Sequence, residues 1–189
     1  MKEEAERCLS CDIYCSVCTT VCPNRANIAF PMAPVDLPLQ TIYSKNNEIT
    51  VEGDDFLRIQ QPLQILNIVD FCNECGNCTS FCPTDGSPYI TKPRFCLTEQ
   101  AFVLEENVYF FQNGILKYKD SEGTSTIRFN QHHLIFEDKQ VTAEFDATTF
   151  ECINAEFIKD DKKSHDLKQA AIMAMYLIKL KGFYLFQST

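Results

Sequence analysis

Apolar and polar residues alternate in short runs over the second half of the chain. Four of these runs are rich in β-branched and aromatic residues and are separated by turn residues: 125–129, 133–136, 140–145 and 150–158. This pattern is typical of antiparallel strands. Asn113-Gly114 separates two further runs, and that dipeptide favours a two-residue hairpin turn. We therefore expect an antiparallel β-meander in this half.

A helical pattern follows the strands. The segment DLKQAAIMAMYLIKLK is rich in helix formers, with Ser164 as a candidate N-cap and Gly182 as a candidate C′ residue. Its apolar face should cover the sheet. Three residues on that face belong in the core because such side chains are usually buried: Met173, Met175 and Tyr176.

The first half has a different pattern. The segment PMAPVDLP has three prolines in eight residues and predicts an extended surface loop. Residues 41–44 and 48–51 flank Lys45-Asn46-Asn47, which favours a hairpin because Asn tolerates positive φ. Residues 63–70 predict a buried strand that leads into a cysteine-rich segment.

Composition narrows the class of protein. Among 189 residues there are eleven cysteines, yet the start MKEEAER has no apolar stretch and so no secretory signal. We therefore expect a reducing, cytoplasmic setting. The apolar run 170–178 is too short for a membrane span, which takes roughly 20 residues. A formal net charge of −9 disfavours nucleic acid, whose binding depends on Lys and Arg.

Four cysteines in the middle of the chain carry the strongest signal. Cys72, Cys75, Cys78 and Cys82 have the spacing C-x2-C-x2-C-x3-C and are followed by proline, as in bacterial ferredoxins. Three thiolates in a tight loop can bind one cubane cluster, while the fourth ligates the other cluster in two-cluster proteins. Gly76 should let the backbone approach the inorganic sulfurs closely.

The first motif has five cysteines for four roles. Its spacing is C-x2-C-x3-C-x2-C-x3-C-P, from Cys8 to Cys22. Aligning it from the Cys-Pro end assigns one cluster to Cys11, Cys15, Cys18 and Cys82, and the other to Cys72, Cys75, Cys78 and Cys22. Cys8 is then a spare ligand, or an alternative to Cys11.

Other metal sites fit the pattern less well. Zinc ribbons need only two cysteines per knuckle, whereas each unit here has at least four. The spacing of Cys11, Cys15 and Cys18 also occurs in radical-SAM enzymes. Those enzymes require a large α/β barrel, whereas the second half of this chain predicts an antiparallel meander. Cys96 and Cys152 lie in apolar segments and predict small buried side chains. His132 and His133 would point to opposite faces of a strand. We find no catalytic constellation.

The segments CxxxCxxCxxxCPNRAN and FCNECGNCTSFCPTDGSPY resemble the C-terminal ferredoxin region of the putative selenate reductase (YgfK-type) family. The resemblance covers about residues 8–95. It implies an association with a FAD- and NADPH-binding flavoprotein part similar to the small subunit of glutamate synthase, and with molybdenum hydroxylases. The loop between the motifs is longer than expected for the family. The chain also has no GxGxxG nucleotide-binding segment.

These patterns together predict an α+β chain. We expect a bacterial two-cluster ferredoxin-like region at 1–98 and a β-rich region with a C-terminal helix at 99–189. The expected cofactors are two [4Fe-4S] clusters, and the expected function is electron transfer within a larger oxidoreductase whose catalytic site lies in another part. The alternative is a structural iron–sulfur docking subunit of a multi-enzyme assembly.

Overall fold

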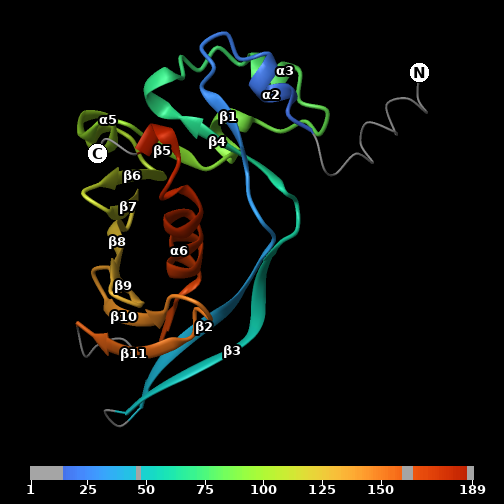
Figure 1. Ribbon diagram of the computed structural model, residues 1–189. Helices are drawn as coiled ribbons and strands as arrows, with labels where there is room; N and C mark the ends of the chain where they lie inside the picture. The colour runs from blue at the N-terminus through green and yellow to red at the C-terminus, as the bar shows by residue number, and fades with distance from the viewer. Residues whose placement is uncertain (1–14, 46–47, 159–163, 187–189) are drawn as a thin grey trace. The chain divides into compact units, whose positions relative to one another are not determined.

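The computed structural model describes residues 15–45, 48–158 and 164–186 (Figure 1). Among the described residues β-strands predominate over helices, which are few and mostly short. They form two compact units, one of residues 1–34 and 60–110 and the other of residues 35–59 and 111–189. No helix in the described part is long and apolar enough to span a membrane.

The first unit contains four strands in the order β1-β4-β5-β6. They are β1 Asn27–Pro31, β4 Leu63–Ile68, β5 Arg94–Cys96 and β6 Val108–Gln112, whose last residues belong to the second unit. β1 and β4 are antiparallel, while β5 runs parallel to both β4 and β6. Short helices precede β1 and link the later strands: α2 Val17–Thr20, η1 Val69–Phe71, α3 Asn77–Ser80, α4 Pro88–Thr91 and α5 Glu99–Leu104. The strand expected at 63–70 is confirmed, with its last residues in η1.

A buried asparagine pair ties this unit together. Asn27 on β1 and Asn67 on β4 face each other in register, and the Asn67 amide donates to Oδ1 of Asn27 at 2.9 Å. Asn27 in turn donates to the backbone oxygen of Cys18 at 3.1 Å. Because both side chains are buried, these bonds are made away from water and fix α2 against the strands.

The second unit contains a five-strand meander and a three-stranded sheet. The meander consists of β7 Ile115–Asp120, β8 Gly123–Asn130, β9 His133–Glu137, β10 Val141–Asp146 and β11 Cys152–Phe157. Consecutive strands pair antiparallel, as the alternating pattern predicts. The other sheet has the order β12-β2-β3, from Ser164–Asp166, Val35–Lys45 and Glu48–Ile59. The turn at Asn113-Gly114 has φ values of 51° and 78°, which suits the expected hairpin.

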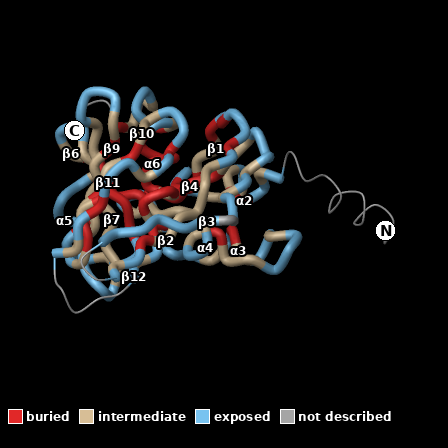
Figure 2. Tube along the Cα trace, turned by 90° about the horizontal axis from the view of Figure 1, so that it is seen from below, coloured by how far each residue is buried: buried red, intermediate tan, exposed pale blue. Residues whose placement is uncertain are grey.

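Helix α6, Lys168–Leu180, supplies much of the core of this unit. It packs against β2, β7 and β8, and Figure 2 shows the buried part of its trace. Met173, Met175 and Tyr176 are all buried, which confirms their expected place. Along β9 and β10 every second residue is buried, so one face of the meander supplies the other half of the core. The helix C-terminus is followed by η2, Tyr184–Phe186.

Two local expectations are wrong. Ser164 is not a helix N-cap, because it lies in β12 and pairs with Tyr43 of β2; the helix begins four residues later. The segment PMAPVDLP is not all loop, because β2 already begins at Val35. Pro38 is accommodated since β12 pairs β2 only at residues 41–43, and a proline is tolerated where a strand has a free edge.

The domain boundaries expected at 1–98 and 99–189 stay a prediction. By contacts, however, the hairpin of β2 and β3 belongs with the second unit rather than the first. Gln40 on β2 shows how it is attached. Its side-chain oxygen accepts the Cys152 N–H at 2.9 Å, and its backbone oxygen accepts the Leu167 N–H at 2.9 Å. One residue therefore bonds to β11 and to the start of α6.

Gly53 occupies the point where the register of β2 and β3 shifts, opposite Gln40. A Cβ at this position would overlap the backbone oxygen of Leu39. We expect Gly53→Ala to lower the free energy of unfolding by about 1–3 kcal/mol, because backbone atoms must shift to relieve the clash. Urea unfolding measures this. Gly182→Ala, where a Cβ meets no atom within 4 Å, is the control and should change stability by less than about 0.5 kcal/mol. If the two replacements lowered the free energy of unfolding equally, the backbone clash assigned to position 53 would be contradicted.

Candidate metal centre

The structure brings the two cysteine motifs together in the first unit. Helices α2 and α3 pack against each other, and each carries one buried cysteine. Cys18 of the first motif and Cys78 of the second belong to one buried cluster with Ile65 of β4. Cysteines separated by sixty residues of sequence are thus neighbours in space.

Equivalent cysteines in the two motifs have equivalent exposure. Cys15 and Cys75 are exposed, Cys18 and Cys78 are buried, and Cys22 and Cys82 are intermediate. Cys72 is also intermediate, while Cys8 and Cys11 lie outside the described residues. The duplication seen in the sequence is therefore also a duplication of local structure, over the part that is described.

Each motif forms one helical turn around its third local cysteine. In α3 the turn begins at Gly76, whose φ of 78° lies in the left-handed region that favours glycine. The Thr79 N–H donates to the Gly76 oxygen at 3.0 Å, and in α2 the Thr19 N–H donates to the Ser16 oxygen at 2.9 Å. Each turn ends at a Cys-Pro pair, since proline has no N–H with which to continue it.

The chain makes the same turn after both Cys-Pro pairs. Arg25 and Asp85 hold matching left-handed conformations, with φ values of 53° and 52°. The next residue in each turn points its N–H at the cysteine sulfur: Ala26 donates to Sγ of Cys22 at 3.2 Å, and Gly86 donates to Sγ of Cys82 at 3.2 Å. Donors of this kind stabilise a thiolate, which is the form of cysteine that binds metal.

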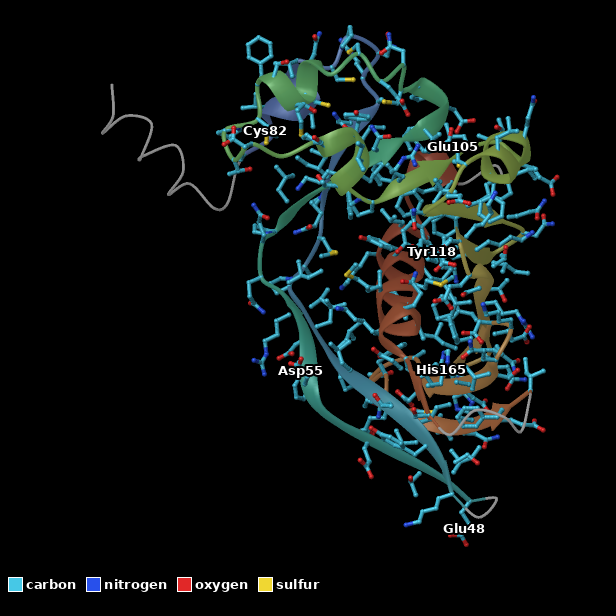
Figure 3. The ribbon with its side chains drawn as sticks, turned by 180° about the vertical axis from the view of Figure 1, so that it is seen from behind. Glu48, Asp55, Cys82, Glu105, Tyr118 and His165 are labelled. Carbon is cyan, nitrogen blue, oxygen red and sulfur yellow. The ribbon has the colours of Figure 1, made fainter. Side chains whose placement is uncertain are left out.

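The surroundings of two cysteines shift their pKa values in opposite directions. The Thr84 hydroxyl, 3.4 Å from Sγ of Cys82, is the main cause that lowers the pKa of that thiol. Burial raises the pKa of the Cys18 thiol. Cys82 is therefore the more readily deprotonated of the two, whereas burial disfavours the thiolate of Cys18. Figure 3 labels Cys82 within its loop.

Cys96 and Cys152 lie outside the shared thiol group. Cys96 is buried with Phe102, Val108 and Phe110, as expected for a small apolar side chain. Cys152, on β11 in the second unit, is partly buried, and burial raises its pKa to about 11. All nine described cysteines are free thiols.

The histidine pair stands apart from the thiols. His132 lies in the turn before β9, and His133 on β9 pairs with Glu144 at 2.5 Å.

In the described part of the chain, no three His, Cys, Asp or Glu side chains are placed to hold a single metal ion.

The donor set fits an iron–sulfur centre. Seven of the eight expected ligand cysteines are described, none is in a disulfide, and two receive N–H···S bonds. Cysteine thiolates are the ligands of [4Fe-4S] clusters. Comparison with known families agrees, because residues 3–85 match the family model of the 4Fe-4S dicluster domain. Residues 3–85 are therefore similar to a 4Fe-4S dicluster domain.

Known proteins confirm the resemblance seen in the sequence. Over 90 residues the chain is 40% identical to "Putative oxidoreductase YgfK" of Escherichia coli K12, and equally to its counterpart in E. coli O157:H7. The match spans 48% of this chain and 6% of each relative's length. No solved structure matches the chain.

Sequence reasoning missed two groups that lie near the motif cysteines. Thr84 follows Cys82 by two residues, and nothing in its spacing shows that its hydroxyl lies against sulfur. Tyr89 of α4 packs against the buried cluster of Cys18 and Cys78. A threonine just after a Cys-Pro pair is a signal that could have identified the first group; the second depends on how α4 packs on α3.

Proposed function

We propose that the chain relays electrons through two [4Fe-4S] clusters held by its dicluster domain, as the electron-transfer component of a larger oxidoreductase. The observation that carries the proposal is the packing of Cys18 with Cys78, together with matched N–H···S bonds at Cys22 and Cys82. Iron–sulfur electron transfer also agrees with the dicluster family match and with an oxidoreductase relative.

The proposed ligand sets cross between the motifs. One consists of Cys11, Cys15, Cys18 and Cys82, and the other of Cys72, Cys75, Cys78 and Cys22. Crossing requires that the two loops be neighbours, and Cys18 and Cys78 do belong to one buried cluster. The charge of Lys92 acts on both Cys18 and Cys82, which supports placing these two cysteines in one set. In two-cluster ferredoxins the fourth cysteine of each motif ligates the other cluster.

The residues of the chain would control the relay by hydrogen bonding and burial. A bound cluster accepts and releases one electron without making bonds to substrate. The N–H groups of Ala26 and Gly86 would offset the negative charge that reduction adds. Burial of Cys18 and Cys78 excludes water from one side of the site, which strengthens these interactions.

To receive electrons from a hydride donor, the chain needs a partner protein. We propose a flavoprotein that uses FAD and NADPH and is similar to the glutamate synthase small subunit, with a molybdenum hydroxylase as a further partner. Two clusters pass single electrons but cannot take up a hydride, which is flavin chemistry. A cytoplasmic location is proposed for a separate reason: the reduced thiols of the site require a reducing compartment.

The test begins with metal content. Anaerobically prepared protein should contain about eight iron and about eight acid-labile sulfide per chain. Dithionite should reduce both clusters, whereas NADPH should do so at a catalytic rate only when the flavoprotein is added. Stoichiometric zinc, or only about four iron, would contradict the two-cluster proposal. Clusters that never change oxidation state during turnover of the intact complex would instead favour the structural docking role.

A further inference from the structure

The two Cys-Pro turns are alike in backbone but differ in the contacts of their sulfurs. Cys22 and Cys82 each accept one N–H at 3.2 Å. Cys82 has an additional contact to the Thr84 hydroxyl at 3.4 Å. Asn24 occupies the position that corresponds to Thr84, and within the described residues no side chain is hydrogen-bonded to Cys22.

A positive charge adds to this difference. Helix α4 packs against α3, and Tyr89 on α4 contacts the buried cluster that contains Cys18 and Cys78. Lys92 follows Tyr89 by three residues at the end of α4 and is half-buried. Its charge contributes to lowering the pKa of Cys82 and offsets part of the rise in the pKa of Cys18 that burial causes. Both thiols belong to the same proposed ligand set.

The other charges nearby do not cancel this asymmetry. Arg25 and Asp85 occupy equivalent turn positions, but both are exposed, so water screens them strongly. Arg94 forms an ion pair with Glu105 at 2.6 Å, which neutralises its charge locally. Cys22 and Cys82 are both partly buried, so burial does not distinguish the two sulfurs. Among the described residues near these two sulfurs, Thr84 and Lys92 remain as the difference.

We propose that the two clusters differ in reduction potential and that the one ligated by Cys82 has the higher potential, with Thr84 and Lys92 setting the difference. The inference rests on the proposed function. Reduction adds negative charge to a cluster, so hydrogen-bond donors to sulfur and a nearby cation stabilise the reduced form and raise the potential. An electron held by the chain therefore resides on the side of Cys15, Cys18 and Cys82.

The experiment is a reductive titration of the full chain followed by EPR, which gives a midpoint potential for each cluster. Thr84→Val removes the hydroxyl and keeps the side-chain shape. It should lower the higher midpoint by about 59 mV, a tenfold change for a one-electron couple, and leave the lower one unchanged. Lys92→Gln should lower the same midpoint. Asn24→Thr places a hydroxyl in the first turn and should raise the lower midpoint instead.

The matched control for the hydroxyl is Thr20→Val, because Thr20 donates to the backbone oxygen of Val17 rather than to sulfur. Lys119→Gln is the control for loss of one charge, taken from the second unit. Both should leave the two midpoints in place. Coincident midpoints in the unaltered protein, or a Thr84→Val variant in which the lower midpoint moves, would overturn the inference. Iron is measured first, so that a deficit defeats the two-cluster proposal itself, whereas full iron with coincident midpoints defeats only the difference between clusters.

Discussion

Cys82→Ala is expected to remove the cluster built by the first motif, and Cys22→Ala the cluster built by the second. Each replacement should reduce the iron content from about eight to about four per chain, since a cubane needs four ligands. The physical reason is that, in the proposed ligand sets, the fourth cysteine of each motif ligates the cluster of the other motif. Iron analysis and EPR of anaerobic protein measure the loss.

Double replacements decide which cysteines share a cluster. Cys82→Ala combined with Cys15→Ala should lose no more iron than Cys82→Ala alone, whereas Cys82→Ala combined with Cys75→Ala should lose about eight. The reverse pattern would show that each motif is self-contained. Cys96→Ala is the control, because Cys96 is buried in a separate apolar cluster and its loss should leave all iron in place. Cys8→Ala should also keep both clusters.

Phe145→Ala should cost about 3–5 kcal/mol in free energy of unfolding, the usual range for a buried phenylalanine. Phe145 lies on β10 with no solvent exposure, and its ring stacks on Phe150 with 4.5 Å between centroids. Removal of the ring leaves a cavity in the core of the second unit. Urea unfolding monitored by circular dichroism measures the effect.

The control for this core variant is Phe56→Ala in the same unit. Phe56 is 42% exposed, and Arg58 lies 5.2 Å from the centre of its ring. Only part of an exposed contact is lost, so the cost should stay below about 1 kcal/mol. If the two replacements cost the same, Phe145 is not part of the core that the structure assigns to it.

The features that sequence predicts well are those set by a few neighbouring residues. Asn113-Gly114 forms the expected turn because both residues accept positive φ. The strands of the meander follow the alternation of apolar and polar residues, which is a local property. Spacing also predicted the cysteine motifs, and Gly76 lies in the left-handed region at the start of α3, as close approach to a cluster requires.

What sequence could not predict depends on partners distant in the chain. Ser164 has the chemistry of a helix cap, but pairing with Tyr43 places it in a strand. The N–H···S bonds at Cys22 and Cys82 depend on turns at Arg25 and Asp85. Aspartate tolerates a positive φ, but arginine gives no such signal, so the matching turns could not be read from the two residue types. The choice between Cys8 and Cys11 as the remaining ligand concerns residues outside those described, and it stays a prediction.

The division of the chain into units has a consequence for inheritance. The chain passes from one unit to the other after residues 34, 59 and 110, so neither unit is one continuous stretch of coding sequence. A gene fragment ending near residue 98 would encode every motif cysteine, but would leave β2 without β12, its partner at Thr41–Tyr43. Exchange of the cysteine motifs alone would thus separate strands that are paired in the folded chain.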